Sequence, residues 1–475
     1  MKEQAFNPYM PSYEYVPDGE PHIVGDRVYV YGSHDKFNGG SFCLGDYVCY
    51  SAPLDNLADW RYEGVIYRRE QDPMARGPRI INGMAAPDMI QGDDGRFYLY
   101  YFIGGTLLIS AAVCDEPAGR YEFYGYVKYE DGVPIGQKGE PYQFDPGLFR
   151  DDDGRVYLYT GFALENNPFL IRGTRPTKKG PMVFELDTSD MLTVKMGPRY
   201  IGLTCSEHPF LEASSMRKFD GTYYFIYSSK LSHELCYATS DNPTSGFKYQ
   251  GTLVSNGDIG IGSTIDLHHA KNDTGNTHGS LIKIKDRYYV FYHRHSNRKQ
   301  SSRQACAEEI RFENGRFIQA QMTSCGLNGG ALRGKGIYPA YICCNLYGRD
   351  GTRFLSMIKY PKGNSPYLTQ KGRDRESGSD QYIANFCSGA IAGYKFFDTD
   401  ATVGIGVLVA GTAKGRMTVT DRDDGGGKVL AEIDIDVCRE KKKFYADFSG
   451  GVKNQALFFS FHGEGAFNFY SFGLK

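Results

Sequence analysis

The chain has 475 residues, of which 41% are hydrophobic and 23% charged, and its formal net charge is −2. This length exceeds what one hydrophobic core usually serves, so we expect two domains. The near-neutral charge excludes a basic field that would attract nucleic acid or an anionic membrane. No stretch is apolar enough for a membrane span or a signal peptide, and the 37 tyrosines, 30 phenylalanines and 58 glycines favour β structure.

The eleven cysteines are scattered along the chain, and only Cys343 and Cys344 are adjacent. There is no CxxC pair, so a zinc site is not expected. Reduced, buried thiols are typical of a protein in a reducing compartment. We therefore expect a cytoplasmic, bacterial protein.

Five similar segments follow one another through residues 1–320. Each begins with a polar turn and continues into a strand of alternating aromatic residues, which is typical of a β-hairpin. They are residues 25–35, 94–105, 153–163, 220–230 and 285–295, with central tyrosines at Tyr29, Tyr98, Tyr157, Tyr224 and Tyr289. A repeat of roughly 60 to 70 residues accommodates a four-stranded blade. The sequence therefore predicts an all-β chain whose first 320 residues form a five-bladed β-propeller.

One polar residue precedes each central tyrosine by nine to twelve positions. The set is Glu20, Asp88, Asp145, Glu212 and His278. Equivalent positions in successive blades face the same channel, so we expect these side chains to converge there. Like charges and desolvation then raise the pKa of some carboxyls. A protonated acid opposite an ionised base is the arrangement that hydrolyses glycosidic bonds.

The runs "PDGEPHIVGDRVYVYGSHD", "AAPDMIQGDDGRFYLYYF", "FDPGLFRDDDGRVYLYTG", "FLEASSMRKFDGTYYFIYSS" and "NTHGSLIKIKDRYYVFYHRH" together resemble glycoside hydrolase family 43. The resemblance covers about two thirds of the chain. It implies an inverting exo-glycosidase for short plant-polysaccharide oligosaccharides, either an α-L-arabinofuranosidase or a β-xylosidase. An exo-β-galactosidase or galactanase activity of the same family is the alternative.

The resemblance also assigns roles to individual residues. It makes Glu212 the general acid, Asp88 the residue that tunes the acid's pKa, and His278 a channel residue that binds water or a calcium ion. No cofactor is implied for the chemistry itself. The residues expected to contact the sugar are Phe37, Asp145 and Arg303.

Glu20 departs from the family pattern, which has aspartate before the proline. Its carboxylate lies about 1.5 Å further from the backbone than that of aspartate, a distance that matters for water activation. Three outcomes stay open: Glu20 is the base, Asp18 serves instead, or the base is lost and the propeller only binds sugar. Retaining fructan hydrolases share the propeller, but their early Asn-Asp-Pro-type motif is absent here.

The character of the sequence changes after residue 320. We expect a Gly-rich connection over residues 321–338 and an antiparallel β-sandwich over 339–475, because short strands with clean alternation follow. This part resembles family 6 carbohydrate-binding modules, although their usual acidic calcium motif is not recognisable. We expect it to pack against the propeller, where it stabilises the propeller or shapes the rim of its pocket; sugar binding is the alternative. The oligomeric state is not specified by the sequence.

Overall fold

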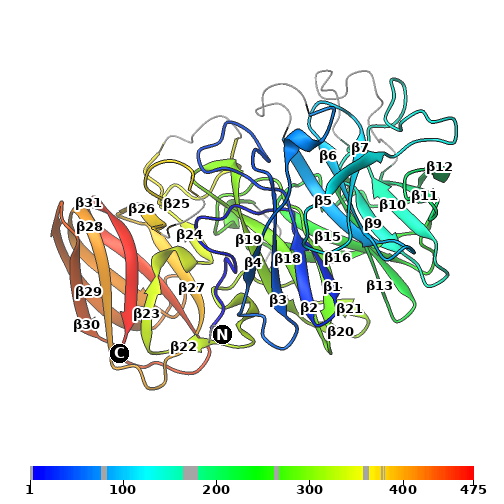
Figure 1. Ribbon diagram of the computed structural model, residues 1–475. Coiled ribbons are helices and arrows are strands. Elements are labelled where there is room, and N and C mark those ends of the chain that lie inside the picture. Colours follow the sequence, from blue (N-terminus) through cyan, green and yellow to red (C-terminus); the bar gives the residue numbers. More distant parts are fainter. Residues whose placement is uncertain are drawn as a thin grey trace.

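The computed structural model describes residues 4–75, 83–163, 180–261, 267–356, 363–375, 378 and 380–475. Strands make up the regular structure of this part of the chain, apart from four single-turn 3₁₀ helices. The longest of these helices has three residues, so none of the described helices could cross a membrane. The prediction of an all-β chain is confirmed. The strands of the propeller lie on one side of the molecule and those of the C-terminal domain on the other (Figure 1).

Five antiparallel sheets follow in chain order and form the blades of the predicted propeller. Blade one comprises β1 (Glu20–Val24), β2 (Arg27–Tyr31), β3 (Tyr47–Pro53) and β4 (Arg61–Tyr67). Blade two comprises β5 (Met84–Gln91), β6 (Phe97–Ile103), β7 (Ile109–Cys114) and β8 (Glu122–Tyr126). Blade three comprises β9 (Gly147–Arg150), β10 (Val156–Thr160), β11 (Met182–Leu186) and β12 (Val194–Tyr200).

Blade four comprises β13 (Phe210–Phe219), β14 (Thr222–Ser229), β15 (Glu234–Ser240) and β16 (Lys248–Ser255). Blade five has three strands, β17 (Ser280–Ile284), β18 (Arg287–Ser296) and β19 (Lys299–Ile310), and a small hairpin of β20 (Phe312–Glu313) and β21 (Arg316–Phe317) follows it. The first strand of each blade contains one of the five predicted polar residues or begins two residues after it, so the repeat was placed on the correct strands.

The N-terminal segment closes the ring of blades. The amide of Tyr9 donates to the carbonyl of Ala305 in β19, and the amide of Asn7 donates to that of Ser324. Val28 and Phe291, from the first and last blades, belong to one buried cluster that also contains Tyr9. Residues 4–19 therefore join the two ends of the propeller through both hydrogen bonds and apolar packing.

The C-terminal domain is one connected ten-stranded sheet that curls around its own core. Its two longest strands, β28 (Gly404–Thr420) and β31 (Gln455–Leu474), pair with each other over most of their length. The other strands are β22 (Leu332–Arg333), β23 (Gly336–Pro339), β24 (Asn345–Tyr347), β25 (Tyr367–Thr369), β26 (Tyr382–Cys387), β27 (Ile391–Asp398), β29 (Val429–Cys438) and β30 (Lys442–Asp447).

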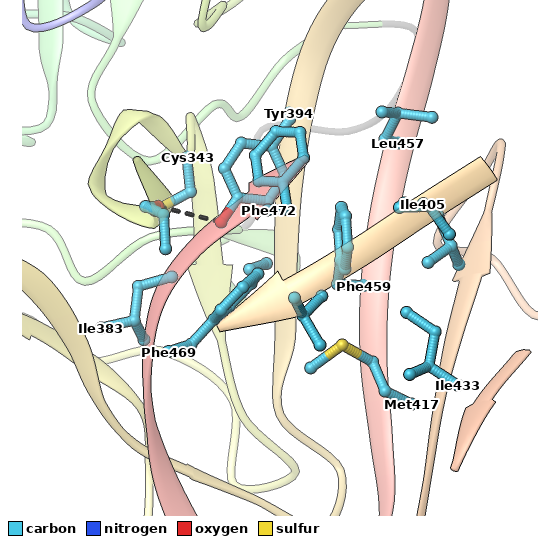
Figure 2. Close-up of a cluster of buried hydrophobic side chains, with 14 of the residues drawn as sticks. Cys343, Ile383, Tyr394, Ile405, Met417, Ile433, Leu457, Phe459, Phe469 and Phe472 are labelled. Carbon is cyan, nitrogen blue, oxygen red and sulfur yellow. Dashed lines mark hydrogen bonds between the residues drawn. The ribbon is translucent and has the colours of Figure 1, made fainter. Parts of the chain in front are cut away.

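Figure 2 shows the core of this domain, in which Phe459 and Phe472 pack against Tyr394, and Phe469 packs against Phe459. The hydroxyl of Tyr394 donates to the carbonyl of Ala340, so its buried polar atom is satisfied. The predicted Gly-rich connection, 321–338, is not merely a linker, because it supplies β22 and the first residues of β23 to this sheet.

Buried polar contacts fix the C-terminal domain against the propeller. Lys395 of β27 donates to Asp258, which follows blade four, at 2.6 Å, and both side chains are almost fully buried. Asp258 also accepts from the side chain of Asn345 in β24 at 2.9 Å. Arg294 of blade five donates to the carbonyl of Cys343 at 2.9 Å. A buried charge that is paired in this way ties the two domains in one orientation.

Candidate active site

A cavity of about 360 Å³ opens on the propeller, and it is lined by two kinds of side chain. The first kind is charged or polar and mostly buried, and the second is aromatic and partly exposed. This volume falls within the range of small-molecule sites. The charged group is Asp18, Asp145, Glu212, His278 and Arg303, and the aromatic group is Phe42, Phe144, Phe162 and Phe354.

The strand register explains which side chains reach this cavity. In each blade, one residue of the first strand pairs with the residue two positions after the central tyrosine of the second strand. These residues, the lower ring, are Glu20, Asp88, Gly147, Ser215 and Ser280. Two positions earlier lies a second set, the upper ring, of Asp18, Ala86, Asp145, Ala213 and His278. Side chains repeat on one face with period two, so Asp18, Asp145 and His278 face the channel above the lower ring and line the cavity. In blades two and four the register shifts between the two rings, and Ala85 and Glu212 line the cavity instead of Ala86 and Ala213.

The upper ring has an unusual backbone. Asp18, Ala86, Asp145 and Ala213 all have positive φ, between 45° and 67°. Non-glycine residues adopt this region rarely, and alanine gains nothing locally from it. Four of the five blades therefore enter the channel through the same strained turn. Backbone strain of this kind concentrates at functional sites.

Glu212 reaches the cavity because β13 is irregular. The register between β13 and β14 shifts on both sides of this residue, between Phe210 and Glu212 and between Glu212 and Ser215. A β-bulge of this kind turns a side chain away from the direction that regular pairing would give it. Glu212 thus lies beside the upper ring without belonging to its register.

Asp18 is held in its ionised form. Burial opposes its charge, but Arg303, His278 and His293 outweigh burial and lower the pKa of Asp18 below its usual value. Arg303 Nη1 donates to Asp18 Oδ1 at 2.8 Å, and His293 Nδ1 lies 3.5 Å from the same oxygen. The guanidinium is fixed from its other side by Asp35 at 2.8 Å. Asp18 is therefore a buried carboxylate anchored through a bridging arginine.

Glu212 and Asp145 are shifted in the opposite direction. Burial and the charge of Asp18 raise the pKa of Glu212 to about 7, against the opposing effect of Arg303. Burial, together with the charges of Glu212 and Asp18, raises the pKa of Asp145 well above its usual value. The cavity thus holds an ionised carboxylate in blade one and a carboxyl that is still largely protonated below neutrality in blade four.

The structure places Glu20 and Asp88 away from this cavity. Both belong to the lower ring, and neither lines the pocket, so their predicted catalytic roles stay predictions. Glu20 accepts from Arg217 at 2.7 Å and from Ser215 at 3.0 Å, both in blade four. Burial raises the pKa of Glu20 to about 8 in spite of Arg217.

Asp88 joins three neighbouring blades. It interacts with His22 Nε2 of blade one at 2.6 Å and accepts from the amide of Leu148 in blade three at 2.6 Å. Although burial opposes its charge, His22 lowers the pKa of Asp88 below its usual value. A carboxylate whose oxygens are bonded in this way is suited to holding the blades together.

Of the three residues predicted to contact the sugar, two line the cavity and one does not. Asp145 and Arg303 line the cavity as expected. Phe37 does not, because it is buried against Tyr15, with ring centroids 5.9 Å apart, and its amide donates to Asp374 of the C-terminal domain at 2.7 Å. Four phenylalanines that line the pocket were not predicted from the sequence. Only Phe42 lies near the predicted position, five residues beyond Phe37.

His278 lies between the two rings. Its Nδ1 lies 3.6 Å from Asp145 Oδ2, and its Nε2 lies 3.9 Å from Glu20 Oε1. That Glu20 oxygen is buried and has no hydrogen-bond partner. The unpartnered Glu20 oxygen offers a calcium ion one oxygen ligand beside His278, and the remaining ligands would come from water. The metal role of His278 stays a prediction.

A five-bladed propeller whose axial pocket holds carboxyls in opposite protonation states has the architecture of a glycoside hydrolase. The chain matches the family described as glycosyl hydrolases family 43 over residues 15–317, and it belongs to that family. Members of the family are inverting glycoside hydrolases, so the predicted enzyme class is confirmed.

Relatives extend this likeness to the whole chain. A xylosidase/arabinosidase of Thermoclostridium stercorarium is 43% identical over 477 residues, covering 100% of this chain and 99% of the relative. A xylosidase/arabinosidase of Bacteroides ovatus is 29% identical and covers 60% of this chain and 87% of its own. The crystal structure of an arabinoxylan arabinofuranohydrolase from Bacillus subtilis superposes with a TM-score of 0.51 over 99% of this chain and 97% of its own, and at 20% identity it supports the fold.

Proposed function

We propose that the protein is an exo-acting xylosidase/arabinosidase in which Asp18 is the general base and Glu212 the general acid. The observation that carries this proposal is the pocket itself, where the pKa of Asp18 is lowered and the pKa of Glu212 is raised to about 7. A base must be ionised and an acid protonated at the working pH.

The position of the two carboxyls suits inversion. Asp18 precedes blade one and Glu212 belongs to blade four, and these blades are not neighbours in a ring of five. The two groups therefore approach a sugar in the channel from different sides. Glu212 gives its proton to the glycosidic oxygen while Asp18 removes a proton from a water that attacks the anomeric carbon from the opposite face.

Arg303 and His278 position the base. Arg303 is locked between Asp18 and Asp35, so it fixes the orientation of the carboxylate that activates water. Asp145 shares the pocket with Glu212, and its proton lets it donate a hydrogen bond to a sugar hydroxyl. A calcium ion beyond His278 would hold that imidazole ring in place and would take no part in bond cleavage.

The sugar is assigned from the relatives together with the shape of the site. A single cavity of about 360 Å³ suits removal of a terminal residue. Full-length similarity to a xylosidase/arabinosidase supports xylose or arabinofuranose as that residue. The C-terminal curled sheet is not shown to be a family 6 module, so sugar binding by that domain on its own forms no part of the proposal.

The test is a substrate panel read by product analysis. Purified enzyme should release xylose from xylobiose or arabinose from arabinofuranosyl xylo-oligosaccharides, one residue at a time from the end. Proton NMR should show the inverted anomer first. Release of internal fragments or of galactose alone would contradict the proposal, as would complete inactivity of a folded protein.

We also propose that the enzyme works in the cytoplasm. All eleven cysteines lie in described parts of the chain, and each is a free thiol. Seven of them are buried, three are half-buried and one is exposed. A reducing compartment keeps such thiols unpaired. Fractionation of the native host should recover the activity with soluble cytoplasmic markers, whereas recovery from the culture medium would refute this assignment.

A further inference from the structure

One aromatic side chain of the pocket comes from the C-terminal domain. Phe354 lies between β24 and β25, beyond the propeller, yet it lines the same cavity as Asp18 and Glu212. The side chain of Phe354 is 54% exposed and therefore more open to solvent than those of Phe42, Phe144 and Phe162, which are half-buried. A single exposed apolar side chain is ordinary on a protein surface, but the ring of Phe354 lies at the cavity, where a ligand that covers it gains the free energy of burying apolar area.

Backbone hydrogen bonds hold Phe354 in place. Its neighbours bracket Thr274, since the amide of Thr274 donates to the carbonyl of Arg353 at 2.8 Å and the amide of Leu355 donates to that of Thr274 at 2.7 Å. On the other side, the amide of Gln300 donates to the carbonyl of Ser356 at 3.3 Å. The segment is therefore pinned to two parts of the propeller.

Both anchoring segments belong to the pocket. Gln300 itself lines the cavity, and so does Asn276, two residues after Thr274. Leu355 is 3% exposed and packs into the seam between the domains, while Phe354 faces the cavity. This alternation is that of an extended strand, with one side chain as anchor and the next presented outward.

The chemistry of an exo-enzyme decides what Phe354 touches. The terminal sugar must lie among the buried carboxyls, because Asp18 and Asp145 are each 4% exposed. The leaving saccharide then extends toward solvent, where the most exposed of the described aromatic side chains of the pocket is Phe354. The apolar C–H face of a pyranose ring packs well on an aromatic face.

We propose that Phe354 forms the subsite for the leaving group, with its ring against the first sugar beyond the cleaved bond. The ligand class is a β-linked pyranose of a xylo-oligosaccharide, and the inference rests on the proposed function. The C-terminal domain thereby completes the active site, so its attachment to the propeller has a role in specificity.

The test compares a substrate that has a leaving sugar with one that has none. Xylobiose offers a leaving xylose, whereas β-D-xylosyl fluoride offers only fluoride; the corresponding arabinofuranosyl pair replaces them if the enzyme prefers arabinose. Phe354→Ala should lower kcat/KM for the disaccharide about tenfold, mainly through KM, because a half-exposed ring loses its sugar face. It should leave the glycosyl fluoride within about twofold.

Controls separate this role from a structural one. Phe354→Trp should restore the rate on the disaccharide. Ile337→Ala should change the rate on neither substrate, because it removes a side chain that is 79% exposed on β23 of the same domain. Equal losses on both substrates, or no loss on the disaccharide, would overturn the inference. If the proposed function itself is wrong, Asp18→Asn leaves the rates on the disaccharide and on the glycosyl fluoride unchanged, and this result distinguishes the two failures.

Discussion

The base is the point on which sequence and structure give different assignments, and two amide substitutions separate them. Asp18→Asn and Glu20→Gln each replace one carboxylate by an amide of nearly the same shape. Asp18 lines the cavity and is ionised through Arg303, whereas Glu20 lies in the lower ring and pairs with Arg217. We expect only the first substitution to remove water activation.

The expected magnitudes follow from these environments. Loss of a general base lowers kcat by about 10²- to 10⁴-fold, which corresponds to about 2.7–5.4 kcal/mol in the barrier. Arg303 keeps its bonds to Asp35 in the Asp18→Asn variant, so the protein should stay folded. Glu20 has a pKa of about 8 and is largely protonated near neutrality, so glutamine imitates its existing state. Its kcat should fall less than about tenfold.

The assay is release of reducing sugar from the preferred disaccharide, with circular dichroism to verify that each variant is folded. Azide offers a second readout, because this anion needs no general base: in Asp18→Ala it can attack the anomeric carbon in place of the water that is no longer activated, and form a glycosyl azide. Asp18→Asn with wild-type activity, or azide rescue of Glu20→Ala instead of Asp18→Ala, would refute the assignment of Asp18. Equal losses in both amide variants of folded protein would refute it as well.

Three further outcomes are expected. Glu212→Gln should lose at least about 10²-fold on disaccharides but keep its rate on the glycosyl fluoride, which leaves without a proton; equal losses would contradict the acid role. The pH profile of kcat/KM should fall on the alkaline side near pH 7, as Glu212 loses its proton, and on the acid side only below the usual aspartate range, as Asp18 gains one. Its alkaline limb should vanish for Glu212→Gln acting on the fluoride, and a persisting limb would assign that titration elsewhere. Arg217→Met should lower the free energy of unfolding, measured in urea, by about 1–3 kcal/mol, because buried acceptors lose their donor. The control is Arg287→Met, which removes an exposed ion pair and should cost less than about 1 kcal/mol. Equal costs of the two substitutions would contradict a structural role of Arg217.

The propeller was predictable because its evidence is local and repeated. Five polar turns, each leading into an aromatic strand, mark the second strand of every blade, and hydrophobic alternation carries that signal within a few residues. The polar residue ahead of each turn also locates the channel correctly. Period-two alternation, however, makes Asp18 and Glu20 equally good channel residues.

Depth along the channel was not predictable in the same way. It depends on the register between the first two strands of each blade, which varies with hairpin length and with the bulge at Glu212. Counting back from the central tyrosine therefore mixed residues of the two rings, taking Glu20 and Asp88 from one and Asp145 and His278 from the other. The two rings are separated only by the strand pairing, in which each lower-ring residue lies opposite the residue two positions after the central tyrosine. No local signal marks Phe354, because only the docking of the C-terminal domain brings it to the pocket.

The lower ring explains why charges remain in a buried channel that does no chemistry at that depth. A propeller axis cannot be filled by one apolar core, since each blade contributes only the edge of its first strand. Glu20 connects blade one to blade four through Arg217 and Ser215, and Asp88 connects blade two to blades one and three through His22 and Leu148. These bonds join four of the five blades directly beneath the upper ring. The catalytic carboxyls can then keep a strained backbone and shifted pKa values, because the ring below them holds the blades in register.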